Sequence, residues 1–121
     1  MNDKPSFNDQ FRKRTKKFSI DVILMCQLLQ RNTINFVIIN QLVKSATSVA
    51  ANYGVACRAR SNNEFFAKIC IVVEEADETQ YRLEVVEESK IDTSDEVRRL
   101  QKEISEILAI VTTAKNNSSR K

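Results

Sequence analysis

The sequence has no histidine and no tryptophan, and it contains one glycine and one proline in 121 residues. Without an imidazole, the chain cannot form Ser-His-Asp or Cys-His nucleophile systems, histidine acid–base catalysts or the usual zinc sites. Sheets need several turns, and turns draw on residues with positive or preset φ angles, so an all-β fold is disfavoured. Long helices with few connections remain, and we expect an all-α protein.

The three cysteines, Cys26, Cys57 and Cys70, are odd in number, widely spaced and set in apolar helical sequence. This favours free buried thiols in a reducing compartment over a disulfide framework. A three-thiolate metal site has no CxxC pair to support it, so we expect no metal and no cofactor. No secretory apolar core follows the basic N-terminal region, and residues 20–29 are too few to span a bilayer. The sequence therefore predicts a cytoplasmic protein.

The length fits one domain, residues 1–121, and the apolar spacing divides it into four helices. The first is expected from about Phe7 to Leu29. The second is expected from about Thr33 to Arg60, with Asn32 or Thr33 as its cap. Its middle is rich in alanine and serine, so we expect the closest helix packing there.

Two sequence patterns predict the starts of the third and fourth helices. Ser61-x-x-Glu64 and Thr93-x-x-Glu96 have the form of capping boxes. Residues 1–6 and 116–121 are polar and are expected to be frayed tails. Four helices with short loops predict a single antiparallel up-down-up-down four-helix bundle.

The third helix carries more apolar residues than one core-facing stripe needs. Alternating steps of four and three from Phe65 to Val86 form the expected core seam. A second apolar row runs beside it and consists of Phe66, Cys70 and Val73. Because a monomeric bundle helix needs only one stripe, this row predicts an oligomer interface.

A polar stripe follows the second helix where core residues are expected. Its residues lie at steps of four, three and four, on one helical face: Gln41, Ser45, Ser48 and Asn52. We interpret the stripe as a structural network in which Ser48 and Asn52 bond to Glu75 or Glu78 of the third helix. One alternative is a ligand or partner pocket, and another is a catalytic carboxylate pair, although nothing nearby positions a nucleophile or metal.

The antiparallel topology places basic and acidic residues at opposite ends of the predicted bundle. The net charge of +3 does not show this separation. Basic residues gather at one end of the predicted bundle, and acidic residues between 84 and 96 gather at the other. The candidate nucleic-acid-binding residues are Arg12, Lys13, Arg14, Lys16, Lys17, Arg58, Arg60, Lys68 and Lys115. Phe7 and Phe11 are expected in the core, so few aromatic rings remain for base stacking and we expect backbone contacts that tolerate any base sequence. The alternative is an ordinary solvated surface.

Several segments resemble a known family. The run from Phe11 to Leu29, the segment SATSVAANY at 45–53 and the segment EEADET at 74–79 are similar to the bacterial "four helix bundle protein" family. This family includes proteins encoded in intervening sequences of large-subunit (23S) ribosomal RNA genes. The resemblance covers nearly the whole chain and implies an antiparallel four-helix bundle that assembles into a ring-like homopentamer.

The resemblance also bears on function. A similar bundle is the accessory protein of diversity-generating retroelements, where it associates with a reverse transcriptase and nucleic acid. The family has no established catalytic residues. Two positions depart from its pattern: many members have an acidic residue at the position of Val55, and an aromatic residue usually stands at the position of Arg82.

Together these features predict an oligomeric, non-enzymatic bundle that binds nucleic acid or a nucleoprotein partner through its basic end. The alternative is a protein–protein scaffold or accessory subunit without direct nucleic-acid contact. We expect neither a membrane partner nor a small-molecule substrate.

Overall fold

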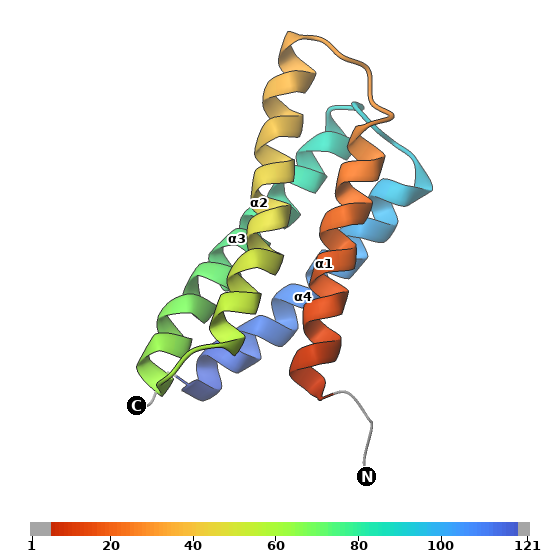
Figure 1. Cartoon of the computed structure of the whole chain (residues 1–121). Helices are drawn as coiled ribbons and strands as arrows, with labels where there is room; N and C mark the ends of the chain where they lie inside the picture. The colour runs from red at the N-terminus through yellow and green to blue at the C-terminus, as the bar shows by residue number, and fades with distance from the viewer. Residues whose placement is uncertain (1–5, 119–121) are drawn as a thin grey trace.

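The computed structural model describes residues 6–118, which form four helices. Their bounds are α1 Phe7–Cys26, α2 Thr33–Cys57, α3 Asn62–Glu88 and α4 Asp95–Ser118. Successive helices run in opposite directions, each packs on the next, and α4 closes back onto α1 (Figure 1). The predicted all-α antiparallel four-helix bundle is confirmed.

Side-chain caps explain where the helices begin. Asn32 and Ser61 have extended backbones, and each side chain accepts the N–H three residues further on, as predicted. The fourth cap lies one residue later than predicted, because Ser94, rather than Thr93, accepts the N–H of Val97 at 3.4 Å. The Asp92 carboxylate accepts the N–H of Ser94 at 2.8 Å and holds the chain in a turn just before α4.

Two helices end earlier than their apolar spacing predicted. α1 ends at Cys26 rather than Leu29, and α2 ends at Cys57 rather than Arg60. After each end the backbone N–H groups bond to carbonyls three residues back, as in the bond from Leu29 to Cys26. The chain thus leaves each helix in a tight turn. Leu29 still packs against the core from this turn, which is why the apolar pattern continues past the helix.

Part of each predicted tail belongs to the described structure. Ser6 caps α1 by accepting the N–H of Asp9 at 3.1 Å. Residues 116–118 belong to α4, Ser118 is buried, and the Asn62 side chain donates to its carbonyl at 3.0 Å. The rest of the predicted tails, residues 1–5 and 119–121, lies outside the described residues.

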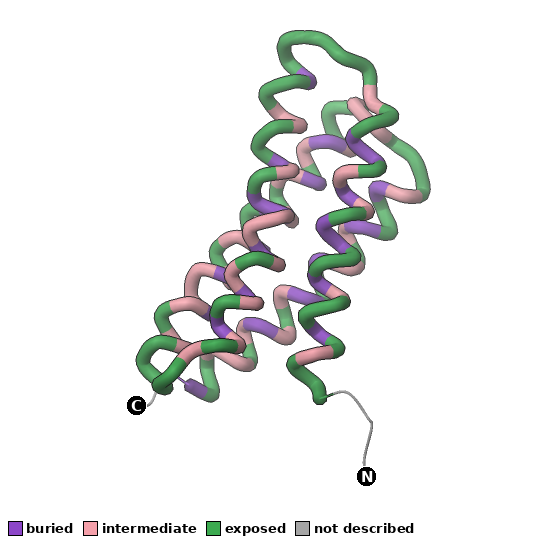
Figure 2. The backbone as a smooth tube through the Cα atoms, in the orientation of Figure 1, coloured by how far each residue is buried: buried purple, intermediate pink, exposed green. Residues whose placement is uncertain are grey.

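The core lies between the four helices, where their buried sides face one another (Figure 2). The predicted seam of α3 is buried from Ile69 to Val86. The middle of α2 allows the close approach that its small residues predicted: the Ser19 hydroxyl of α1 donates to the Ala46 carbonyl of α2 at 2.9 Å. None of the four described helices combines the length and apolar character needed to cross a bilayer.

The second apolar row of α3 is half-covered within the subunit. Phe66, Cys70 and Val73 are all partly buried, and Phe66 and Val73 pack against the subunit's own core. Glu87, two heptads after Val73 on the same helical face, accepts from Gln101 of α4 at 2.7 Å. The row therefore lies toward α4, and packing within one chain accounts for much of its apolar character.

Candidate nucleic-acid interface

The basic residues gather at the end of the bundle where α1 begins, α2 passes into α3 and α4 ends (Figure 1). The opposite end carries the α1–α2 and α3–α4 connections. There several carboxylates are paired, since Glu87 bonds to Arg98 at 3.1 Å and Glu96 bonds to Arg99 at 2.7 Å. The bundle is thus polarised, although pairing reduces the negative field of the acidic end.

Arg12 of α1 and Arg58 at the end of α2 converge on one polar pocket of about 380 Å³. A Cβ atom added to Gly54 would lie 3.8 Å from the Arg58 guanidinium, so this side chain extends back along α2 over Gly54. Arg12 also contacts Asp9 at 2.7 Å, and this hydrogen bond lowers the pKa of the Asp9 carboxyl. The predicted proximity of Arg58 to the basic cluster of the first helix is present.

Four lysines of this end have no acidic partner within residues 6–118. Lys13 and Lys16 are exposed on the outer side of α1, one helical turn apart. Lys68 and Lys115 are half-buried, and neither forms an ion pair with a described residue. With Arg12 and Arg58, these four lysines are the cations best able to meet an external anion.

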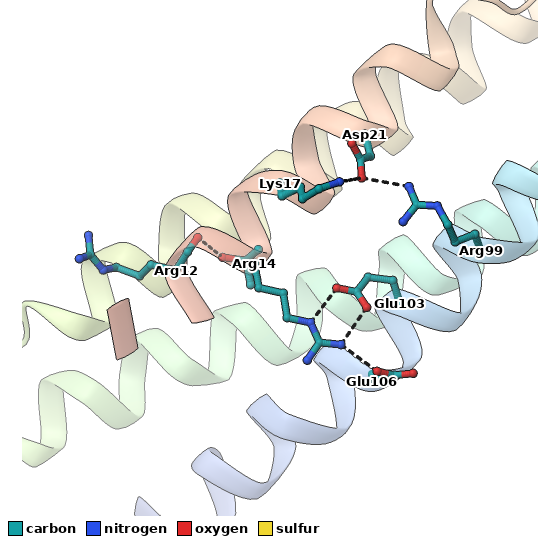
Figure 3. Close-up of polar contacts among 8 residues, drawn as sticks. Arg12, Arg14, Lys17, Asp21, Arg99, Glu103 and Glu106 are labelled. Atoms are coloured by element: carbon teal, nitrogen blue, oxygen red, sulfur yellow. Dashed lines mark hydrogen bonds and ion pairs between the residues drawn. The ribbon is translucent and has the colours of Figure 1, made fainter. Parts of the chain in front are cut away.

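Arg14 points instead into the contact between α1 and α4 (Figure 3). Its Nε donates to Glu103 at 2.7 Å, and its Nη2 donates to Glu103 and Glu106, both at 2.8 Å. The hydrogen bonds from Arg14 lower the pKa of Glu103. Because α4 packs beside α1, it brings these carboxylates, which are far from Arg14 in the sequence, into contact with it. The sequence analysis had counted Arg14 among the unpaired cations.

Two further candidates are also paired. Lys17 donates to Asp21 at 2.8 Å, and Asp21 accepts from Arg99 of α4 at 2.9 Å as well (Figure 3). Arg60 lies 3.8 Å from Glu64. The same Glu64 accepts the backbone N–H of Arg60 at 3.1 Å, so its side chain is held against the α2–α3 turn. Arg14, which two carboxylates hold, is therefore the least available of the predicted cations. Lys17 and Arg60 remain exposed, and each has one carboxylate neighbour, as Arg12 does.

The aromatic residues at this end differ from expectation. Phe11 is buried, as predicted, but Phe7 is 63% exposed. The two rings stack with centroids 5.6 Å apart, and Phe11 meets Tyr53 edge to face at 4.8 Å. Phe7 lies in the first turn of α1, where the loosest of the four helix contacts leaves space between α1 and α4. The helical pattern predicts which face of α1 is apolar. It does not show where that face extends beyond the neighbouring helices and becomes exposed.

The polar stripe bridges α2 and α3 through other partners than predicted. The Thr79 hydroxyl donates to Ser45 at 2.9 Å, and Arg82 donates to Gln41 at 3.0 Å. Ser48 and Asn52 bond to each other within α2 instead of reaching Glu75 or Glu78. Thr79 belongs to the predicted core seam of α3 and is fully buried, so the seam itself, rather than the carboxylates, meets the stripe.

The acidic part of α3 contains one carboxyl group with a shifted pKa. Burial, and then the neighbouring Glu78, raise the pKa of Glu75. In the described part of the chain, no group of three or more cysteine and acidic residues could hold a metal ion. The three cysteines are free, and burial raises the pKa of the Cys26 thiol to about 11, so Cys26 remains protonated at neutral pH.

Comparisons with known proteins agree on one fold and one family. The model of the family described as 23S rRNA-intervening sequence protein matches residues 8–113. A crystal structure from Bacteroides thetaiotaomicron, titled as a protein with unknown function from the S23 ribosomal protein family, is similar with a TM-score of 0.79. It is 25% identical, and the match covers 86% of this chain and 96% of that chain. No curated protein matches the chain.

Proposed function

The chain belongs to the 23S rRNA-intervening sequence protein family, and we propose that it is a non-enzymatic, homo-oligomeric bundle that binds RNA through its basic end. The observation that carries this proposal is the convergence of Arg12 and Arg58, from two helices, on one pocket. Lys13 and Lys16 are exposed on the same helix as Arg12. Arginines present several donors to a phosphate, and nearby lysines add positive charge. The family name, which refers to 23S rRNA, favours RNA over DNA as the ligand.

The proposed contact is with the RNA backbone. Exposed cations without carboxylate partners release counterions from RNA when they meet phosphates, so binding weakens as salt rises. With about four phosphate contacts, the logarithm of the binding constant should fall with the logarithm of salt concentration at a slope of about −3. Arg14, held by Glu103 and Glu106, contributes little to this slope.

Self-association is supported by the outer face of α2. This 25-residue helix contains one charged residue, Lys44, although one side of it is open to solvent. Its exposed apolar side chains include Ile34, Val37 and Val55. These side chains are more exposed than Phe66, Cys70 and Val73 of α3. The α3 row remains a candidate for the edge of the interface between subunits.

The exposed α2 face therefore serves as the proposed contact between subunits, in the ring-like pentamer that the family resemblance implies. A ring would present several basic ends together. Repeated weak phosphate contacts on one assembly raise the overall affinity through avidity, without any change within a single subunit.

Fluorescence anisotropy of labelled RNA, titrated with the purified protein at low and moderate salt, tests the proposal. We expect binding at low salt that weakens with the stated slope. No binding at low salt would overturn it.

The apolar face of α2 also favours a second function, that of a protein scaffold or accessory subunit without nucleic-acid contact. Charge reversal at Lys13 and Lys16 distinguishes the two. A scaffold keeps its partner after this change, whereas an RNA-binding protein loses its ligand.

A further inference from the structure

A second pocket lies beside the Arg12–Arg58 pocket and has a different chemical character. It measures about 430 Å³, within the range of about 300–1,000 Å³ that is typical of small-ligand sites. Phe7 of α1 and Tyr53 of α2 line one side. The last three turns of α4 line the other side, mainly with aliphatic residues, together with Thr113 and Asn117.

The two pockets share a wall. Tyr53 lines the apolar pocket, Asn8 lines the basic pocket, and the Tyr53 hydroxyl donates to Asn8 Oδ1 at 3.1 Å. Phe7 and Asn8 are consecutive residues in the first turn of α1. An aromatic, largely apolar space thus adjoins a space edged by two guanidinium groups, and the hydrogen bond fixes the boundary between them.

Phe7 is well placed for stacking. Its ring is 63% exposed, and it is backed by Phe11, which lies nearly parallel to it at an interplanar angle of 9°. Phe11 is itself fixed by burial and by its edge-to-face contact with Tyr53. The exposed ring therefore rests on a rigid support, as an aromatic platform for a nucleic-acid base requires.

We propose that the apolar pocket receives one unpaired base of a single-stranded RNA, stacked on Phe7, while neighbouring phosphates lie on Arg12 and Arg58. This inference rests on the proposed function and adds the strandedness of the RNA. The Asn117 amide and the Thr113 oxygen, whose hydroxyl donates to the Ala109 carbonyl at 3.1 Å, offer hydrogen bonds to the edge of the base.

The charged groups of the site suit either form of RNA, and the shape of the apolar pocket favours a single strand over a duplex. Arg12 keeps donors beyond the one that Asp9 occupies, and Arg58 has no acidic partner among the described residues, so both can bind phosphate. The bases of a duplex are stacked and paired, and one of them could enter the pocket only after it left the helix. Single strands expose the faces of their bases and pay no such cost.

The test compares three labelled RNA probes of equal length by fluorescence anisotropy: a single strand, the corresponding duplex, and a single strand with abasic positions. The variants are Phe7→Ala, Phe7→Leu and Phe7→Tyr. We expect the wild type to prefer the intact single strand over the abasic strand. Phe7→Ala and Phe7→Leu should weaken single-strand binding about tenfold and leave duplex and abasic binding unchanged, whereas Phe7→Tyr should retain the preference.

The outcomes separate this inference from the proposed function. If the wild type binds all three probes equally and Phe7→Ala changes nothing, the stacking pocket is refuted and RNA binding through phosphates stands. If Phe7→Ala weakens all three probes alike, its effect is not base stacking, and the inference fails. If no probe binds at low salt, both proposals fail. Thermal unfolding followed by circular dichroism verifies that the exposed Phe7 variants remain folded.

Discussion

Arg14 of α1 and Glu103 of α4 are joined by two parallel hydrogen bonds of 2.7 and 2.8 Å, across 89 positions of sequence. The pair spans the contact between α1 and α4, which is the least extensive of the four contacts between neighbouring helices. Its fork geometry is the strongest arrangement that an arginine and a carboxylate can form. The pair therefore helps to close the bundle between its first and last helices.

Replacing Arg14 with alanine should destabilise the fold. We expect the free energy of unfolding to fall by about 1 kcal/mol, less than for a buried pair, because both side chains keep contact with water. Urea denaturation measures this change. Arg12→Ala is the matched control, since the exposed Arg12–Asp9 pair should contribute almost nothing. Equal loss in both variants would contradict the special role of Arg14.

The same pair makes stability depend on pH. The hydrogen bonds from Arg14 lower the pKa of Glu103 in the folded state, so the unfolded chain binds its proton more readily. The stabilisation is complete above the unfolded pKa of about 4.3 and is lost as the pH falls through the lower folded value. In urea titrations between pH 7 and pH 3, Arg14→Ala should lose less stability than the wild type. A parallel decline in both proteins would argue against this coupling.

The polar contact between α2 and α3 can be tested with a double-mutant cycle. Thr79→Val should cost about 1–2 kcal/mol, because it leaves the buried Ser45 hydroxyl without its cross-helix partner. The double variant Ser45→Ala, Thr79→Val should lose less than the sum of the single changes, with a coupling of about 1 kcal/mol. The Asn52–Glu78 pair, expected from sequence but absent from the structure, serves as control and should show no coupling. Coupling in the control alone would reverse the assignment.

The sequence predicted well those features that depend on periodicity and poorly those that depend on how helices rotate against one another. The seam from Ile69 to Val86 and the cap at Ser61 follow from residue spacing, and both lie where expected. Asn52 bonds to Ser48 rather than to Glu78, because the angle at which α2 faces α3 decides which side chains meet. Spacing within one helix contains no information about that angle.

The candidate site, too, was predicted only where it depends on helix order and residue spacing. Antiparallel topology was enough to bring Arg58 to Arg12. It did not reveal that Glu103 and Glu106 of α4 would hold Arg14, since that depends on the level at which α4 passes α1. Phe7 continues the apolar spacing of Phe11 and was therefore placed in the core, although its ring is exposed beside a pocket.

Self-association through α2 predicts a change in mass. The double variant Ile34→Glu, Val37→Glu places two charges on the exposed apolar face and should convert the oligomer to a folded monomer. Light scattering gives the mass, and circular dichroism verifies helix content. Ser105→Glu, on an exposed position of α4, is the control and should leave the mass unchanged. A wild type that is already monomeric would rule out the ring.

RNA binding by the basic end is the central claim, and a salt titration of matched charge-reversal variants tests it most directly. Lys13→Glu, Lys16→Glu reverses two free cations of the basic end, and Lys90→Glu, Lys102→Glu makes the same change in net charge at exposed positions elsewhere. Anisotropy with a labelled RNA should show at least about tenfold weaker binding and a shallower salt slope for the first variant alone. Equal losses in both variants, or no RNA binding by the wild type at low salt, would contradict the account.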